Sequence, residues 1–383
     1  MTNQNKGTAK GRRAFLRTMA VGGAAVAAGT VVAPNVSRGQ SSPISMRWQS
    51  TWPSKDIFHE YANDFAKKVN DMTGGELRIE VLPAGAVVPA FGLLDAVSSG
   101  TLDGGHGVLV YHYGKSNALA LWGSGPGYGM DANMLLSWHK YGGGKALLEK
   151  IFRSINANVV SFPYGPMPTQ PLGWFKKPIQ KLEDLQGLKY RTVGISIDVF
   201  TGLGCAVNAL PGGEIVPAMD RGLLDAAEFN NATSDRILGF ADVSKVYMLK
   251  SYHQNAEQFE ISFNKTKFDA LPAKMRAIIE NAVEAASQDM SWKAIHRYST
   301  DHAALKTQDK VRMYSTPSAI LQKQLDVYDE VTAKKAAADP LFKEVMDSQI
   351  AFARRAVTWE LETVVDRRMA YNHYFARRAA GRG

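Results

Sequence analysis

Two charged residues near the middle of the chain have the chemistry needed to bind a small carboxylate. Arg191 lies in a predicted strand over 188–193, a position from which a side chain reaches into a cleft between two lobes. Its planar guanidinium can donate two parallel, charge-assisted hydrogen bonds to a carboxylate. Glu228 follows a predicted short strand, where it could orient the arginine or bind a cation through oxygen. Taken alone, an arginine at this position is more often a surface or lobe-stabilising residue, and Glu228 is more often a salt-bridge partner.

Three further polar residues occupy similar places in the sequence. Gln170 precedes a predicted strand over 172–176, and its amide could supply one more oxygen to a ligand or cation. Tyr111 and His112 come at the end of a predicted strand over 107–111, on the side that would face Arg191. Tyr111 could donate a hydrogen bond to a ligand oxygen, or it could simply be a packed tyrosine at a strand end.

The sequence argues against the common kinds of catalytic site. Cys205 is the only cysteine, so an intramolecular disulfide and a cysteine cluster for a metal are excluded. The eight histidines are scattered, and none lies in an H-E-x-x-H arrangement. Gly202 and Gly204 lack the third glycine of a dinucleotide-binding loop, and no G-x-S-x-G nucleophile elbow occurs. We therefore expect a binding protein and not an enzyme, without a redox cofactor.

The N-terminal segment has the pattern of an export signal. Residues 11–17 (GRRAFLR) precede a mildly apolar stretch over 19–32, which is shorter than the roughly 20 residues that span a bilayer. This pattern predicts a twin-arginine signal over 1–42, with an uncertain cleavage site, and a periplasmic protein. Removing its six basic residues and no acidic ones lowers the net charge from +9 to +3. Nucleic acid is therefore not an expected partner.

Helical and strand periodicities alternate along the chain after this segment. Ser54 is expected to cap a helix, because Phe58, Tyr61, Phe65 and Val69 recur at helical spacing. Strands alternating with helices predict a parallel sheet covered by helices on both faces. The first such unit comprises predicted strands over 46–51, 77–81 and 107–111 and helices over 54–73 and 91–97.

A second α/β unit begins near Met167, with predicted strands over 172–176 and 188–193 and helices from 198 and 214. The chain then returns to the first unit through an alternating strand over 258–264. We therefore expect a two-lobe periplasmic-binding-protein fold with hinge-crossing strands and a ligand cleft between the lobes. The predicted boundaries are 43–165 with 253–310 for lobe I, 166–252 for lobe II and 311–383 for C-terminal helices.

The C-terminal region predicts one long amphipathic helix. After Pro340 there is neither glycine nor proline up to Arg378, and apolar residues from Met346 to Val364 step by three or four. Such a helix would run for roughly 50 Å, which exceeds the width of one lobe. It would either pack along its own monomer or reach a second subunit in a homodimer.

Two long motifs resemble a known transport family. Residues 181–191 (KLEDLQGLKYR) resemble the "DLKGLKxR" motif of the solute-binding subunits of TRAP (tripartite ATP-independent periplasmic) transporters. Residues 210–215 (LPGGEI) and 220–228 (DRGLLDAAE) resemble its "PGGEIxxALxRGxIDAAE" motif, and the resemblance extends over the chain after the signal. It implies an extracytoplasmic receptor that captures a small carboxylate and delivers it to TRAP membrane subunits.

Within that family, Gln170 followed by Gly173-Trp174-Phe175 resembles the branch that binds 2-oxo acids such as pyruvate or 2-hydroxy acids such as lactate, often with a metal cation. The resemblance implies that Arg191 grips the ligand carboxylate. It also implies that sodium or calcium is held by the Gln170 amide oxygen, the Glu228 carboxylate and the Phe229 carbonyl. Closure of the two lobes over the ligand would signal to the transporter.

The sequence departs from this family pattern at two places. Phe229 stands where many relatives have tryptophan, which matters little if its backbone carbonyl contacts the cation. Residues 252–255 (YHQN) stand where relatives often have Trp-His-Glu-Pro, so Gln254, a further candidate ligand contact, removes a negative charge close to the cleft. This change could alter the ligand, for example towards an aromatic carboxylate. A receptor that signals to a membrane kinase would share the same site.

Overall fold

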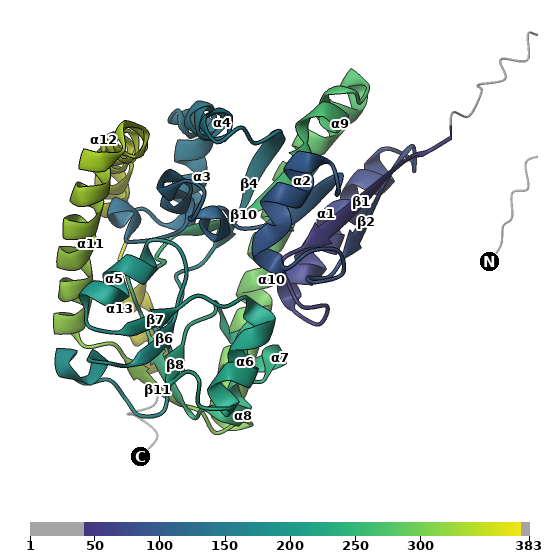
Figure 1. Cartoon of the computed structure of the whole chain (residues 1–383). Helices are drawn as coiled ribbons and strands as arrows, with labels where there is room; N and C mark the ends of the chain where they lie inside the picture. The colour runs from purple at the N-terminus through teal and green to yellow at the C-terminus, as the bar shows by residue number, and fades with distance from the viewer. Residues whose placement is uncertain (1–41, 377–383) are drawn as a thin grey trace, which may run out of the picture. The chain divides into compact units, whose positions relative to one another are not determined.

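The computed structural model describes residues 42–376, which belong to one compact unit. The predicted signal peptide lies outside the described residues apart from Ser42, as do residues 377–383. The fold is α/β with two sheets, as the sequence predicted (Figure 1). The domain boundaries proposed from sequence remain a prediction.

The first sheet holds the strands that begin the chain. Its order is β2 (Leu77–Leu82), β1 (Ile44–Ser50), β3 (Gly104–Gly107), β10 (Glu257–Asn264) and β4 (Val159–Met167). β1 runs parallel to β2 and β3, whereas β10 runs antiparallel to β3 and β4. The parallel pairing expected for the first three strands is confirmed, and the returning strand β10 adds an antiparallel part because it enters from the opposite end.

The strand predicted over 107–111 lies earlier in the chain. β3 covers the run Gly104-Gly105-His106-Gly107, and a 3-10 helix, η2 (Leu109–His112), follows it. A Cβ on Gly104 would approach the Trp48 ring to 2.4 Å, so only glycine allows this strand to pack against its neighbours. The apolar residues after it are buried in η2 and not in a strand.

The second sheet is built from short strands. Its order is β11 (Arg312–Ser315), β9 (Val246–Leu249), β5 (Gly173–Phe175), β8 (Ala226–Ala227), β6 (Lys189–Arg191) and β7 (Ala206–Asn208). β6 runs parallel to β7 and β8, so Arg191 and the chain just after Ala227 end at the same edge. This register places the two motif segments side by side.

Helices cover both sheets and connect their strands. The α-helices before β10 are α1 (Ile57–Met72), α2 (Leu93–Ser99), α3 (Ala132–Tyr141), α4 (Gly144–Ser154), α5 (Ser196–Gly202), α6 (Gly212–Asp220), α7 (Ala232–Leu238) and α8 (Phe240–Val243). Those after it are α9 (Lys265–Asp269), α10 (Ala273–Thr307), α11 (Ser318–Ala338), α12 (Pro340–Thr363) and α13 (Arg367–Tyr371). Further short helical turns are η1 (Ala90–Gly92), η3 (Asn117–Trp122), η4 (Gly127–Gly129), η5 (Leu182–Leu185) and the π-helix η6 (Asn372–Ala376).

The N-cap residue of α1 is not the one that the sequence predicted. Asp56, and not Ser54, is the N-cap, since its Oδ1 accepts a hydrogen bond from the Phe58 backbone N–H at 3.2 Å. The same oxygen accepts a hydrogen bond from the Ser234 hydroxyl of α7 at 2.6 Å. This cap therefore also joins the helix after β1 to a helix that flanks the second sheet.

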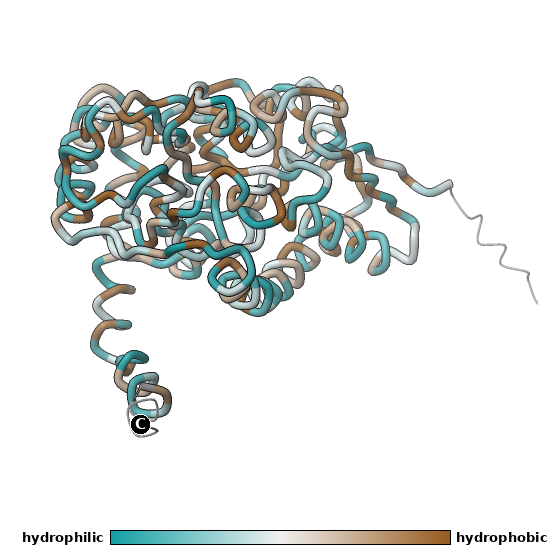
Figure 2. The backbone as a smooth tube through the Cα atoms, turned by 90° about the horizontal axis from the view of Figure 1, so that it is seen from below, coloured by the Kyte–Doolittle hydropathy of each residue, from teal (hydrophilic) through white to brown (hydrophobic). Residues whose placement is uncertain are grey.

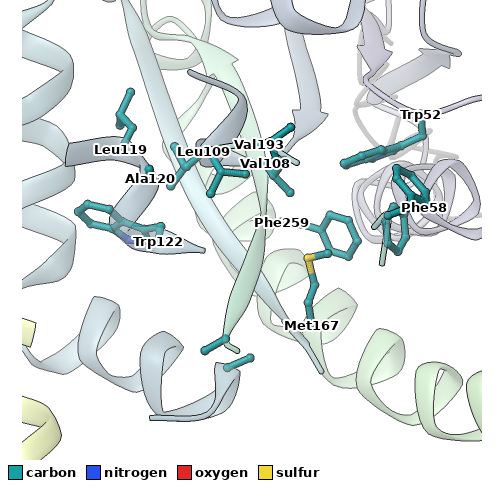
Figure 3. Close-up of a cluster of buried hydrophobic side chains, with 14 of the residues drawn as sticks. Trp52, Phe58, Val108, Leu109, Leu119, Ala120, Trp122, Met167, Val193 and Phe259 are labelled. Carbon is teal, nitrogen blue, oxygen red and sulfur yellow. The ribbon is translucent and has the colours of Figure 1, made fainter. Parts of the chain in front are cut away.

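One long helix and one core join the elements around both sheets. α10 forms ion pairs with α1, through Lys68 and Asp289 at 2.6 Å, and with α7, through Arg236 and Asp301 at 3.1 Å. Nearly all of the buried apolar residues form a single cluster. Within it, Phe259 of β10 packs edge-on against Phe58, their ring centroids 4.7 Å apart (Figure 3).

The predicted single helix from 340 to 378 is interrupted. α12 ends at Thr363, Val364 is extended, and Asp366 caps α13 by accepting from the Arg368 N–H at 2.8 Å. The helix ends here without a glycine or a proline, because Val364 and Val365 are β-branched and Asp366 is a strong N-cap for the next helix. The segment beyond α12 leaves the body of the protein (Figure 2).

Within residues 42–376, no helix is at once long enough and apolar enough to cross a membrane.

Candidate functional site

Arg191 and Glu228 form a buried ion pair at the edge of the second sheet. Both side chains are almost fully buried, and Arg191 Nη1 donates to Glu228 Oε1 at 2.8 Å. The guanidinium also donates to the Leu210 carbonyl at 2.8 Å and to the Glu228 carbonyl at 3.2 Å. These bonds fix the plane of the guanidinium, so the orientation of its remaining nitrogen, Nη2, is fixed as well.

A second pair of polar residues lies against this ion pair. Gln170, in the segment before β5, donates from Nε2 to Glu257 Oε2 at 2.7 Å, and its backbone N–H donates to the Gln254 carbonyl at 3.2 Å. Glu257 is the first residue of β10 and is buried. Its carboxyl interacts electrostatically with both Glu228 and Arg191. The four side chains therefore form one cluster.

Several buried atoms of this cluster, and one of the Gln254 side chain beside Glu257, have no hydrogen-bond partner among the described residues. They are Arg191 Nη2, Glu228 Oε2, Gln170 Oε1 and Gln254 Oε1. An unsatisfied buried polar atom costs about 1–3 kcal/mol, so four close together mark a place where water or a ligand supplies the missing partners. The set contains one cationic donor and three oxygen acceptors, which is the complement of a carboxylate accompanied by a cation.

Burial controls the protonation of the acidic residues. It raises the pKa of Glu228 to about 7, although the neighbouring Arg191 opposes this. It raises the pKa of Glu257 to about 8, and repulsion from Glu228 adds to the effect. For Arg191, burial lowers the pKa, but Glu228 and Tyr111 raise it by more, so the guanidinium stays charged. A cation bound next to these two carboxyls would therefore lower both pKa values and favour the ionised form of each.

Glycines make room for the cluster. A Cβ on Gly123 would lie 2.7 Å from Glu257 Cγ, so this position must be glycine for Glu257 to point inward. Gly173 has a φ of +122°, and a Cβ there would lie 2.9 Å from Glu228 Cα. The glycine of the G-W-F segment therefore lets β5 approach the backbone that carries Glu228.

The other predicted site residues take different positions. Tyr111 is half-buried in η2, close enough to Arg191 to affect its pKa, and burial raises the pKa of Tyr111 itself to about 12. The Phe229 ring lies 5.9 Å from the Arg191 guanidinium, measured from its centroid. His112 hydrogen-bonds through Nε2 to Glu260 Oε2 at 2.9 Å. The structure thus brings Tyr111 and Phe229 to Arg191 and pairs His112 with β10.

Sequence reasoning missed Glu257 and His253. The signal for Glu257 was an acidic residue at the start of the alternating strand, close to the substituted position Gln254. His253 is buried with Nε2 unpartnered, and burial together with the charge of Arg191 lowers its pKa to about 3. Glu257 thus places a buried carboxyl close to the position where Gln254 replaces an acid.

The residues present suit a hard cation bound by oxygen. Among the described residues, no group of three or more His, Cys, Asp or Glu side chains could hold a metal ion. A cation in this cluster would instead use carboxylate and amide oxygens, which are ligands typical of calcium and sodium and unsuited to zinc. The unpartnered oxygens of Glu228 and Gln170 fit this requirement.

Comparison with known proteins places this cluster in context. The model of the family "bacterial extracellular solute-binding protein, family 7" matches residues 49–339. A monocarboxylate 2-oxoacid-binding periplasmic protein from a Nostoc species is 33% identical over 355 residues, which cover 91% of this chain and 95% of that protein.

Solved structures of TRAP solute-binding proteins are similar over the whole of their chains. The protein from Bordetella bronchiseptica, a dimer with calcium and picolinate, gives a TM-score of 0.82 at 26% identity and covers 89% of this chain and 100% of its own. The proteins from Colwellia psychrerythraea, with calcium and pyruvate, and Pseudoalteromonas atlantica, with sodium and pyruvate, each give 0.80. Their identities are 29% and 28%, and each covers 87% of this chain and 100% of its own.

Proposed function

Because the chain belongs to family 7 of the bacterial extracellular solute-binding proteins, we propose that it captures a small 2-oxo or 2-hydroxy monocarboxylate, such as pyruvate or lactate, and delivers it to TRAP membrane subunits. The members of this family are solute-binding proteins and not enzymes. One observation carries the proposal: a charged, buried arginine with a free donor atom lies beside unpartnered oxygens. The solved neighbours with pyruvate and a cation support it.

Each residue of the cluster has a distinct part in binding. Arg191 donates to the ligand carboxylate through Nη2, while its other bonds hold the guanidinium in place. Gln170, Glu228 and the Phe229 carbonyl hold the cation, which supplies positive charge to the ligand oxygens. Tyr111 and Gln254 complete the wall of the site. No bond of the ligand is made or broken, and binding favours the closed arrangement of the lobes.

A thermal-shift screen tests this proposal. The chelator-treated protein is heated with pyruvate, lactate, longer 2-oxo acids and picolinate, each with calcium, with sodium and with neither. We expect the largest rise in melting temperature for a 2-oxo or 2-hydroxy monocarboxylate with a cation, because a ligand that binds only the folded state stabilises it. A larger rise with picolinate would favour an aromatic carboxylate, as the Bordetella neighbour suggests. No rise with any acid would refute the carboxylate proposal.

We also propose that the chain reaches the periplasm by the twin-arginine route. The support is the GRRAFLR segment at residues 11–17 and the short apolar stretch after it. Replacing Arg12 and Arg13 by lysine together keeps the charge but removes the pair. The expected result is retention of the precursor in the cytoplasmic fraction, whereas normal export of this variant would exclude the route.

The region from Trp359 to Phe375, at the end of α12 and after it, supports a homodimer, and the occupant that we propose for its surface is a second copy of this chain. Most of its large apolar side chains are more than half exposed, which an isolated monomer rarely tolerates in one contiguous region. They are Trp359, Leu361, Val365, Met369, Tyr371, Tyr374 and Phe375. Figure 2 shows this segment extending away from the body. The Bordetella neighbour is itself a dimer.

Light scattering on the intact chain and on a form ending at Thr363 tests the dimer. We expect twice the monomer mass for the intact chain and the monomer mass for the truncated one, with pyruvate binding retained in both. A monomer in both cases would remove the dimer from the proposal without affecting the ligand site.

A further inference from the structure

We infer that Tyr113, Asp198 and Lys335 form a three-way contact that holds the ligand site closed and slows release of the bound acid. The inference rests on the proposed function, because it concerns how long the site keeps the carboxylate. Tyr113 directly follows η2, Asp198 lies in α5, and Lys335 lies in the last turn of α11. Three parts of the chain that are distant in sequence therefore meet at this contact.

Each of these three side chains touches the other two. The Tyr113 hydroxyl donates a hydrogen bond to Asp198 Oδ2, and Lys335 Nζ lies 3.2 Å from the same oxygen. Lys335 Nζ also lies 5.0 Å from the centroid of the Tyr113 ring, within the range of a cation–π interaction. All three side chains are half-buried. Because they share one oxygen and are partly shielded from water, their contact is stronger than an isolated pair of surface charges.

The three-way contact lies close to the ligand cluster along the chain. Tyr113 comes two residues after Tyr111, whose hydroxyl lies close to the Arg191 guanidinium. Asp198 comes seven residues after Arg191, on the helix that follows β6. The bond between Tyr113 and Asp198 therefore joins the segment that carries Tyr111 to the segment that carries Arg191. It fixes the end of η2 from which Tyr111 reaches the site.

The chain between β6 and Asp198 packs directly against elements that follow β3. Gly194 has a φ of +63°, and a Cβ there would lie 2.2 Å from Ser124 Oγ and 3.3 Å from Val110 Cβ. Glycine is therefore needed for this close approach. Elements of the two sheets thus meet here, and they separate at this place when the site opens. Opening breaks the three-way contact, because Tyr113 and Asp198 lie on opposite sides of this boundary.

A contact of this kind changes release more than capture. Tyr113 and Asp198 are apart while the site is open, so the ligand enters without their bond. They come together on closure, and they must separate again before the ligand leaves. Removing the contact destabilises the closed arrangement alone. It therefore raises the rate constant of release and leaves the association rate constant unchanged.

The experiment follows radiolabelled pyruvate by rapid filtration. Protein loaded with labelled pyruvate and calcium is diluted into excess unlabelled pyruvate, which gives the release rate, and mixing label with ligand-free protein gives the association rate. The variants are Tyr113→Phe, which removes the hydroxyl and keeps the ring, Lys335→Met, and both together. Tyr141→Phe and Lys334→Met are the matched controls, because Tyr141 on α3 and Lys334 on α11 are exposed.

We expect Tyr113→Phe and Lys335→Met each to release pyruvate about three- to tenfold faster than wild type, with association rate constants within about twofold of wild type. The controls should match wild type. The double variant should release pyruvate more slowly than the product of the two single effects requires, because both bonds end on one oxygen of Asp198.

An unchanged release rate in folded Tyr113→Phe overturns the inference, and so does a change in association alone. If Tyr113→Phe does not fold, Lys335→Met decides in the same way. Single effects that multiply fully in the double variant also overturn it, since the two residues would then act separately.

These failures are distinguishable from failure of the proposed function. If wild type binds pyruvate and the variants release it at the wild-type rate, only the role of the three-way contact is wrong. If another acid of the thermal-shift screen binds instead, its labelled form replaces pyruvate. If no acid binds, the carboxylate receptor is wrong, and the inference falls with it.

Discussion

Two fully buried carboxylates, Asp235 and Glu228, differ in how completely their oxygens are satisfied. Asp235 Oδ2 accepts from Trp174 Nε1 at 2.8 Å and from the Tyr247 hydroxyl at 2.9 Å, and its Oδ1 accepts from the Asn230 N–H at 3.3 Å. Glu228 has one oxygen bonded to Arg191 and one without a partner.

Burial alone therefore does not identify a binding residue. It raises the pKa of Asp235 to about 6 and that of Glu228 to about 7, so the two shifts are alike in direction and cause. The difference lies in the remaining hydrogen-bonding capacity. Both oxygens of Asp235 accept hydrogen bonds from neutral donors of the protein, which is typical of a buried structural network. Glu228 Oε2 has no well-formed hydrogen bond, although the Thr192 hydroxyl is close enough to lower the pKa of Glu228.

The largest effect is expected from Arg191→Ala. It removes the proposed donor to the ligand carboxylate, and losing one partner of a buried charged hydrogen bond costs about 2–5 kcal/mol, so affinity for pyruvate should fall about 30- to 4000-fold. The fold should survive, because the Glu228 carboxyl, whose pKa is already about 7, can take up a proton. Calorimetry and circular dichroism measure both properties.

Arg312→Ala is the matched control for this substitution, since Arg312 is exposed on β11. Its affinity and melting temperature should equal those of wild type. If Arg191→Ala keeps wild-type affinity, Arg191 is not the carboxylate-binding residue. An unpartnered buried group would then not identify a ligand contact in this protein.

Asp235→Ala should show the opposite pattern. It leaves Trp174 Nε1 and the Tyr247 hydroxyl buried without their acceptor, at a cost of about 1–3 kcal/mol in the free energy of unfolding. Affinity for pyruvate should change by less than about threefold, because Asp235 offers no free atom to a ligand. Urea unfolding and calorimetry test this. A large loss of affinity without loss of stability would place Asp235 in the site and contradict the comparison.

The elements with clean periodicity were predictable from the sequence. The strand expected over 258–264 is β10, because alternation marks one face clearly, and the helix with Phe58 and Phe65 is α1. β4 was missed because Pro163 and Pro166 interrupt its pattern. The 35 residues of α10 were missed since this helix touches several elements and has no single apolar face.

Only part of the candidate site could be predicted from the sequence, and the reason is physical. Arg191 and Glu228 lie in recognisable motifs, and the parallel pairing of β6 and β8 brings them together. Glu257 has no motif of its own, and only the pairing of β10 places its side chain against Gln170. Contacts between segments 87 residues apart depend on sheet order, which local spacing does not encode.

The smallest effect, on the pH dependence of stability, concerns a carboxylate between these two extremes. Asp56 Oδ1 is bonded to Ser234 and the Phe58 N–H, whereas its Oδ2 has no partner among the described residues. Burial raises the pKa of Asp56 to about 7 from the value of 3.8 expected when unfolded. Between these values the folded protein keeps a proton that the unfolded chain releases, so the contribution of Asp56 to stability falls as pH rises from about 4 to about 7.

Asp56→Asn removes this dependence, because the amide does not titrate. The free energy of unfolding, measured in urea without ligand at several pH values, should fall less steeply for the variant, by at most about 1.4 kcal/mol per pH unit within that window. Outside the window the two slopes should agree, and Asp220→Asn, which removes an exposed carboxylate, should follow wild type throughout. An identical slope in wild type and Asp56→Asn would mean that Asp56 is ionised in the folded protein, so that burial does not raise its pKa.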